Sequence, residues 1–359
     1  MVEREKSKAI RQFIIEQVEK SSQDIVRLTS KRFAISRQAA NRHIHALIGN
    51  GLIIAEGSTR QRKYKLKPII DKTFHFTVSK DLQEHIIWRN YIRPLLDKIT
   101  PNILDICHYG FTELVNNVVD HSAGTMMTVT VVQTAINIRL SILDNGVGIF
   151  KKIQTEFGLE DQTHAILELA KGKLTTDPEH HTGEGIFFSS RMFNRFTIMS
   201  GKLYFAHNEI GDDWLLWFEE DDVGQKEGTF IIMEIDNNST RTTKEVFDKY
   251  SAENDEYGFS RTIVPVVLAQ YGNENLISRS QAKRLLARLE KFREVILDFE
   301  KVETIGHAFA DEIFRVFKTK NPHIHLMHIN ANKEVQKSIL RAIQNGNSAN
   351  SSQTSSLAE

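Results

Sequence analysis

The chain has one cysteine, no net charge and no long apolar run, and each of these absences narrows what the protein is. The single cysteine, Cys107, excludes a disulfide within the chain, and its place on an apolar helix face predicts a core residue. The first six residues are too charged for a secretory signal. No apolar run approaches the roughly 20 residues that a membrane helix needs. We therefore expect a cytoplasmic protein without membrane contact.

The chain does have enough apolar residues for several cores, and its charge is unevenly distributed. The 359 residues are 40% hydrophobic, which suits two or three domains. Residues 1–67 carry fifteen Lys/Arg against six Asp/Glu, a net of +9, so the remainder carries −9. The basic N-terminal end is therefore the candidate for a polyanion partner.

A first block of polar residues lies in the middle of the chain, on an expected helix. The apolar positions that recur at three- and four-residue spacing are Ile103, Ile106, Gly110, Leu114 and Val118. Glu113, Asn117 and His121 are each four residues apart, so they share one face of this helix. A carboxylate, an amide and an imidazole are therefore expected to project together.

Two further polar blocks follow, and each combines glycine with a polar side chain. Alternating apolar residues over 136–142 predict a strand that enters the turn Asp144-Asn-Gly-Val-Gly148. A carboxylate there can accept a hydrogen bond from an amino group, and glycines let a flat ligand approach the backbone. The block Thr182-Gly-Glu-Gly-Ile186 precedes an expected helix, whose free amides suit phosphate oxygens. Each block alone usually marks a plain turn, whereas all three in this order are specific.

Over residues 73–235, the three blocks resemble the ATP-binding domain shared by DNA gyrase B subunits, mismatch-repair ATPases, sensor histidine kinases and anti-sigma-factor kinases, the GHKL type. The resemblance implies an α/β sandwich with helices on one face of a mixed sheet, and ATP and Mg²⁺ as cofactors. It assigns Asn117 to the magnesium ion and Glu113 to activation of the attacking hydroxyl or water. Asp144 would accept from the adenine amino group. Sensor kinases commonly lack a Glu at the position of Glu113, so its presence predicts turnover.

The resemblance also assigns the other cofactor-binding positions. They are Gly146 and Gly148 beside adenine, Thr182, Gly183 and Gly185 in the phosphate block, and Thr229, which matches a threonine that touches adenine through water. Residues 150–181 would form a lid over the nucleotide. The lid residues that are candidates to close over the triphosphate are Lys171, Lys173, Thr175 and Thr176.

The N-terminal 67 residues resemble a winged helix-turn-helix domain, because three short helical patterns precede a basic hairpin. Helices are expected over 4–20 and 23–30, and a third begins after Ser36 and ends at Asn50. The exposed residues that suit base edges are Arg37, Gln38, Asn41 and Arg42, and those that suit phosphates are Arg60, Arg62 and Lys63. DNA is the expected partner. A dimerisation or protein-docking module is the alternative.

The sequence around residues 171–178 and 181–188 resembles bacterial proteins that pair this ATPase with a STAS-like domain of unknown function. Alternating strand and helix patterns from Phe259 onward agree with such a small α/β domain. STAS anti-anti-sigma factors carry a phosphorylatable Ser before the second helix, but here the loop is Thr304-Ile-Gly-His-Ala-Phe309. His307 is interpreted as a helix-start residue, with phosphate acceptance by His307 or Thr304 as the alternative.

The expected fold class is α+β and multidomain. The predicted parts are a winged helix-turn-helix (1–67), an ATP-binding domain (72–236), a linker (237–257), a STAS-like domain (258–345) and a disordered tail (346–359). The first hypothesis is an ATP-hydrolysing regulator that couples nucleotide state to DNA binding and transcription control. The alternative is an anti-sigma-type protein serine kinase that acts on a separate partner, and a scaffold without turnover is a third. A protein partner of the STAS-like domain and a second copy of the chain are further candidate partners.

Overall fold

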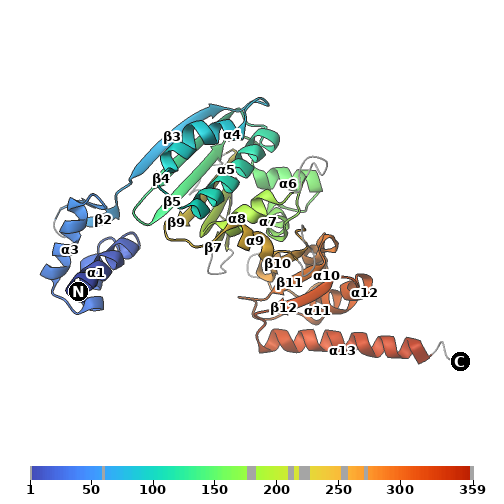
Figure 1. The fold of residues 1–359 in the computed structure, drawn as a ribbon. Coiled ribbons are helices and arrows are strands. Elements are labelled where there is room, and N and C mark those ends of the chain that lie inside the picture. Colours follow the sequence, from blue (N-terminus) through green and yellow to red (C-terminus); the bar gives the residue numbers. More distant parts are fainter. Residues whose placement is uncertain are drawn as a thin grey trace.

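The computed structural model describes residues 2–58, 61–175, 183–208, 214–217, 227–251, 258–270 and 274–355. The chain is mixed α+β, and its described strands form a two-stranded, a seven-stranded and a three-stranded sheet. Figure 1 shows the N-terminal part at one end, the large sheet in the middle and the C-terminal part at the other end. Within the described ranges, no helix is long and apolar enough to cross a membrane.

The N-terminal part contains three helices and a hairpin in the predicted order. The elements are α1 (Val2–Gln17), α2 (Ile25–Phe33), α3 (Arg37–Gly49), β1 (Ile53–Glu56) and β2 (Lys63–Leu66). Ser36 caps α3 as predicted, because its hydroxyl accepts from the Ala39 amide at 3.1 Å. A separate apolar core, which includes Ile14, Ile44 and Leu47, holds the three helices together.

The central sheet has the strand order β3-β4-β5-β9-β6-β7-β8. Its strands are β3 (Ile70–Thr77), β4 (Met126–Gln133), β5 (Asn137–Asp144), β6 (Arg195–Ser200), β7 (Leu203–Asn208), β8 (Trp214–Trp217) and β9 (Thr229–Asp236). Every pairing is antiparallel, whereas a mixed sheet was predicted. The reason is that β9 lies between β5 and β6 and runs opposite to both. The acidic run Glu219-Glu-Asp-Asp222, between β8 and β9, lies outside the described residues.

The helices of the central part are α4 (Glu84–Ile87), α5 (Pro101–His121), α6 (Ile149–Phe157), α7 (Gln162–Lys171), α8 (Gly185–Met192) and α9 (Thr243–Lys249). The long helix α5 packs against β5 and α8. The helix α4 passes into a π-helical segment, Trp88–Ile92, and then into a 3-10 segment, Arg93–Leu96. Pro94 lacks a backbone N–H, which explains the break.

The predicted linker is largely structured where it is described. Thr242 and Glu245 form a capping box at the start of α9, and Val246 and Tyr250 are buried. The Asn102 amide on α5 donates to the carbonyls of Ser239 and Arg241 at 2.8 and 3.0 Å. Residues 237–251 thus include a short helix and are held against the central part by these contacts. Residues 252–257 lie outside the described ranges.

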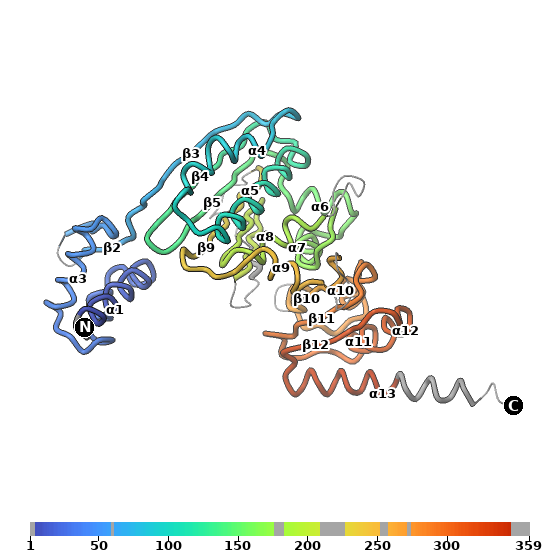
Figure 2. The backbone as a smooth tube through the Cα atoms, in the orientation of Figure 1, coloured from blue at the N-terminus to red at the C-terminus, as the bar shows by residue number. Residues whose placement is uncertain are grey.

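The C-terminal part is a three-stranded parallel sheet with helices, as the alternating pattern predicted. Its elements are β10 (Arg261–Pro265), α10 (Arg279–Leu286), β11 (Glu294–Asp298), α11 (His307–Asp311), α12 (Lys318–Lys320), β12 (His325–Ile329) and α13 (Lys333–Ser355). One apolar core runs continuously from the central part into this part. Figure 2 shows α13 extending along the edge of the C-terminal part.

The helix α13 continues to Ser355, into the range 346–359 for which a disordered tail was predicted. Its first turns are held by the buried residues Val335, Ile339 and Ala342. Extending an established helix is far easier than nucleating one, so a polar segment that follows such turns can remain helical.

Candidate functional site

All three polar blocks meet around one cavity of about 290 Å³ on the central part. The lining residues that come from these blocks include Glu113, Asn117, His121, Asp144, Gly148, Gly183 and Gly185. Thr229, at the start of β9, also lines the cavity. Residues more than one hundred positions apart in the sequence are thus brought to one place.

The helix α5 supplies one wall of this cavity. Glu113, Asn117 and His121 all line it, which confirms that they share a face. Another side of the helix is buried in the core, where Phe111 and Cys107 are fully enclosed. Burial raises the pKa of the Cys107 thiol to about 12, so this cysteine is a core residue as predicted.

Asp144 ends β5 and is held by its own turn. Its side chain is 5% exposed, and Oδ1 accepts from the Gly146 amide at 2.7 Å. Burial raises the pKa of Asp144 above its ordinary value, and hydrogen bonds from Gly146 and Thr229 offset part of this effect. The Thr229 hydroxyl also accepts from the Ile149 amide at 3.0 Å. A carboxylate and a hydroxyl therefore lie together at this end of the cavity.

The glycines of the second block have two different surroundings. Gly148 lines the cavity, whereas Gly146 does not. A Cβ atom on Gly146 would lie 2.1 Å from the carbonyl oxygen of Ser122, so the turn is pressed against the end of α5. Gly146 therefore shapes the turn that carries Asp144, instead of flanking a ligand as predicted.

The third block begins α8 and faces Glu113. A Cβ atom on Gly185 would lie 2.1 Å from Glu113 Oε2, so the carboxylate reaches the first turn of α8. Gly183 has a φ of +72°, and the Leu174 amide donates to its carbonyl at 3.1 Å. Thr175 also lines the cavity. The predicted residues Thr176 and Thr182 lie outside the described ranges.

The two predicted lid lysines do not line the cavity. Lys171 is 1% exposed, and its ammonium lies 2.7 Å from Glu168 Oε1. It also donates to the carbonyls of Arg284 and Ala287 in the C-terminal part, at 3.1 and 2.9 Å. Its donors are thus committed elsewhere, which corrects the prediction that it closes over a triphosphate. Lys173 donates to the Lys291 carbonyl at 3.1 Å.

Several cavity residues were not predicted, and four of them belong to α6. Ile149, Ile153 and Phe157 line the cavity at four-residue spacing, and Lys152 adds a cation to the same wall. This spacing was the available signal, because it places three apolar side chains on one helix face directly after the glycine turn. An apolar wall of this kind suits the face of a flat ring.

The residues predicted to contact DNA are accessible where they are described. On α3, Arg37, Gln38 and Arg42 are exposed and Asn41 is half-buried. Arg62 and Lys63 are exposed at the hairpin, and Arg60 lies outside the described ranges. This part of the chain therefore presents a basic, polar surface on the third helix and the hairpin.

The described residues contain no group of three or more His, Cys, Asp or Glu side chains that could hold a metal ion. Protein carboxylates and imidazoles alone therefore do not build a metal centre in this part of the chain.

Comparison with known proteins identifies the C-terminal part. Residues 281–336 match the family model of a STAS-like domain of unknown function (DUF4325). No curated protein matches the chain. The matched residues run from α10 to the beginning of α13 and include Arg284, Ala287 and Lys291, which contact the two lid lysines. The chain thus carries a STAS-like domain in its C-terminal part, as predicted.

Proposed function

We propose that the chain binds ATP with magnesium in the α5–β5–α8 cavity, hydrolyses it, and uses the nucleotide state to control DNA binding by its N-terminal part. In this proposal residues 72–236 are a GHKL-type ATP-binding domain and residues 1–67 a winged helix-turn-helix. The observation that carries it is the convergence of Glu113, Asn117, Asp144, Gly183 and Gly185 on one cavity. In this proposal, nucleotide-dependent DNA binding would control transcription.

The chemistry of the lining suits each portion of the nucleotide. Asp144 accepts from the adenine amino group, and the apolar face of α6 covers the ring. The first amides of α8 and the Gly183 turn receive phosphate oxygens, because a helix start favours negative charge. Asn117 would hold magnesium together with phosphate oxygens and water, the ligands this ion prefers. Bound magnesium would neutralise phosphate charge during transfer.

Glu113 is positioned as the base of the reaction. Its carboxylate reaches the first turn of α8, where the terminal phosphate is placed in this proposal. A carboxylate there accepts the proton of a water molecule as the water attacks the phosphorus, and the leaving ADP departs with the bonding electron pair. A side chain that only bound ATP before the reaction would not need to lie at the first turn of α8.

The strand β5 offers a route from the cavity to the N-terminal part. Ala135 and Ile136, just before β5, pack on the N-terminal core, and Asp144 ends the strand in the cavity. Eight extended residues span about 25 Å. ATP at about 100-fold over its dissociation constant for one state contributes roughly 2.7 kcal/mol. That free energy moves a 1:99 equilibrium to about even.

A protein serine kinase is the second candidate, and the STAS-like domain favours it, because STAS domains are natural partners of anti-sigma kinases. Glu113 would then activate a hydroxyl of a partner instead of water. The loop before α11 contains no serine, and His307 begins α11 as predicted. The substrate would therefore be a separate protein.

One experiment separates these functions. The full chain is incubated with γ-labelled ATP, magnesium and cell extract, and free phosphate is separated from protein-bound label. Glu113→Gln removes the proposed base, and Glu300→Gln, on an exposed loop, is the matched control. The proposal expects free phosphate, lost in Glu113→Gln and kept in Glu300→Gln. Label on a protein would support the kinase. If neither free phosphate nor labelled protein formed, only the role of a scaffold without turnover would be left.

A further inference from the structure

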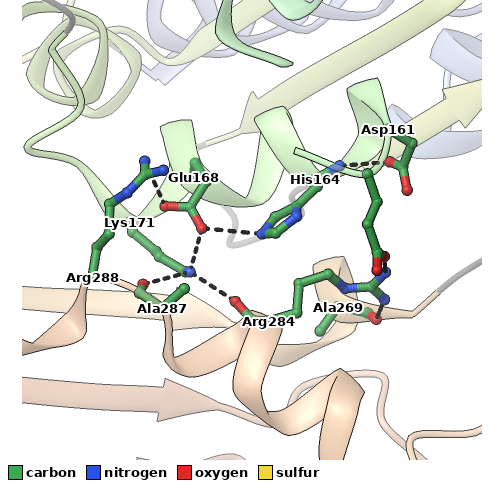
Figure 3. A network of polar contacts seen from close by, with 9 residues as sticks. Asp161, His164, Glu168, Lys171, Ala269, Arg284, Ala287 and Arg288 are labelled. Atoms are coloured by element: carbon green, nitrogen blue, oxygen red, sulfur yellow. Dashed lines mark hydrogen bonds and ion pairs between the residues drawn. The ribbon is translucent and has the colours of Figure 1, made fainter. Parts of the chain in front are cut away.

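A buried polar network joins α7 to the STAS-like domain (Figure 3). Glu168, which is 2% exposed, lies at its centre. Its carboxylate lies 2.7 Å from Lys171 Nζ, 3.3 Å from His164 Nε2 and 3.2 Å from Arg288 Nη1. Burial alone would raise the pKa of Glu168, but His164, Lys171 and Arg288 outweigh it and hold the pKa below its ordinary value. The carboxylate is therefore charged and paired across the interface.

Lys171, the last residue of α7, is held through both its side chain and its backbone. Its ammonium donates to the carbonyls of Arg284 and Ala287, at the end of α10, where a cation is favoured. Its own carbonyl accepts from the Thr262 hydroxyl on β10 at 2.8 Å. Lys171 thus ties α7 to both a strand and a helix of the C-terminal part.

Of the four residues after this anchor, the first two contact the C-terminal part and the next two line the cavity. Gly172 has a φ of +84°, and a Cβ there would lie 2.6 Å from the ring of Phe259. The ammonium of Lys173 donates to the Lys291 carbonyl and lies 5.0 Å from the centre of the Phe292 ring. Leu174 and Thr175 then line the cavity. Lys173, which contacts the domain, is therefore the direct neighbour of Leu174 in the cavity wall.

A second contact reaches the cavity from the same domain. The guanidinium of Arg288 lies 4.0 Å from the centre of the Phe157 ring, and Phe157 lines the cavity. Arg288 also pairs with Glu168, so one side chain touches both the buried network and the cavity wall. The STAS-like domain therefore supports the wall at two points, behind α6 and behind residues 174–175.

We infer that the STAS-like domain is an internal clamp on the nucleotide site, with Lys173 as the positioning residue that places Leu174 and Thr175. This inference rests on the proposed ATP site. Because coupling between two sites is reciprocal, a protein that binds the STAS-like domain near α10 changes ATP affinity, and ATP changes the affinity for that protein. A protein bound to this domain would thus act on the cavity through Lys173 and the adjacent residues Leu174 and Thr175.

The test compares three variants of the full chain. Lys173→Met keeps the length of the side chain but removes its charge and donors, and Lys173→Arg restores both. Lys283→Met is the control, because Lys283 is an exposed lysine of α10. ATP affinity and KM are measured by titration and by phosphate release. Hydrogen exchange of the Leu174 amide, which donates to Gly183, is measured without nucleotide.

For Lys173→Met we expect a roughly 10-fold weaker ATP affinity, equivalent to about 1.4 kcal/mol, with KM raised more than kcat is lowered. We also expect exchange at Leu174 to be roughly 10-fold faster. Lys173→Arg should restore both values, and Lys283→Met should match the parent chain. Unchanged exchange and unchanged affinity in Lys173→Met would overturn the clamp while leaving the ATP site intact. Absence of ATP binding in the parent chain would instead overturn the proposed function, and faster exchange at Leu174 would still show the mechanical link.

Discussion

Replacing Lys171 by methionine separates a structural role of this lysine from a role at the phosphates. The change keeps the length of the side chain but leaves Glu168 with Arg288 and His164 as its remaining partners. It also leaves the carbonyls of Arg284 and Ala287 without this donor. Breaking a buried ion pair on one side costs about 3–5 kcal/mol. Because Arg288 still balances part of the Glu168 charge, we expect a loss near the lower end, about 3 kcal/mol.

The assay is denaturant unfolding of the full chain, followed by a signal from the C-terminal part. Lys244→Met is the matched control, since Lys244 and Asp248 form an equally short pair, at 2.6 Å, that is largely exposed. An exposed pair contributes about 0.5 kcal/mol or less. The double variant Glu168→Gln/Lys171→Met should lose less stability than the two single variants together, because neither partner is left as an unpaired charge.

Two results would refute this reasoning. The first is a Lys171→Met chain that unfolds at the same denaturant concentration as the parent. The second is additivity in the double variant, which would mean that Glu168 and Lys171 do not interact. If stability were unchanged but ATP binding were lost, Lys171 would serve the phosphates, as the sequence alone predicted.

Three further predictions follow from the site. ATP affinity should fall as the pH is lowered through the pKa of Asp144, because only the carboxylate is a charged acceptor; burial raises this pKa above 3.8. The contribution of Asp144 to folding stability has the opposite pH dependence. It is present at low pH and is lost as the pH rises through that pKa. Measurements of ATP affinity and of folding stability from pH 7 downward, with Asp144→Asn as the pH-independent control, check the two signs. Gly183→Ala should be more destabilising than Gly158→Ala, although both glycines have positive φ. A Cβ at Gly183 would lie 2.5 Å from the Leu174 backbone, whereas a Cβ at Gly158 would meet nothing within 4 Å. Each substitution also costs about 1 kcal/mol for the left-handed backbone, and thermal unfolding measures the difference between the two variants. Cys107, with its pKa raised to about 12, should resist thiol reagents at pH 8 in the folded chain and react after denaturation, and rapid labelling of the native chain would contradict its burial.

The sequence was sufficient to predict those parts of the site that depend on local spacing. The shared face of Glu113, Asn117 and His121 follows from the four-residue step of a helix, and the structure confirms it. The cap at Ser36 and the strand that ends at Asp144 are likewise local patterns. Regular spacing along one element is enough to fix these features.

The features that sequence analysis missed depend on contacts between distant segments. Lys171 lies in a lysine-rich stretch before the glycine block, but its partners Arg284 and Ala287 are 113 and 116 residues further along the chain. The strands β4 and β6 were also missed, but there a local signal was present. Met127, Val129 and Val131 alternate with threonines in β4, and Phe196 and Ile198 alternate with polar or less buried residues in β6. The packing of α9 also depends on distant residues, because Val246 and the neighbouring Tyr250 are buried against the core.

The most direct test of the central claim is a titration of the full chain with ATP and magnesium, followed by calorimetry, with Asp144→Asn as the matched variant. We predict one ATP bound per chain, and binding that is roughly 10- to 100-fold weaker in the variant, which is the free energy of a hydrogen bond to a charged group. Parent and variant chains that bind ATP equally, or a parent chain that shows no binding at millimolar ATP, would contradict the assignment of this cavity to the nucleotide.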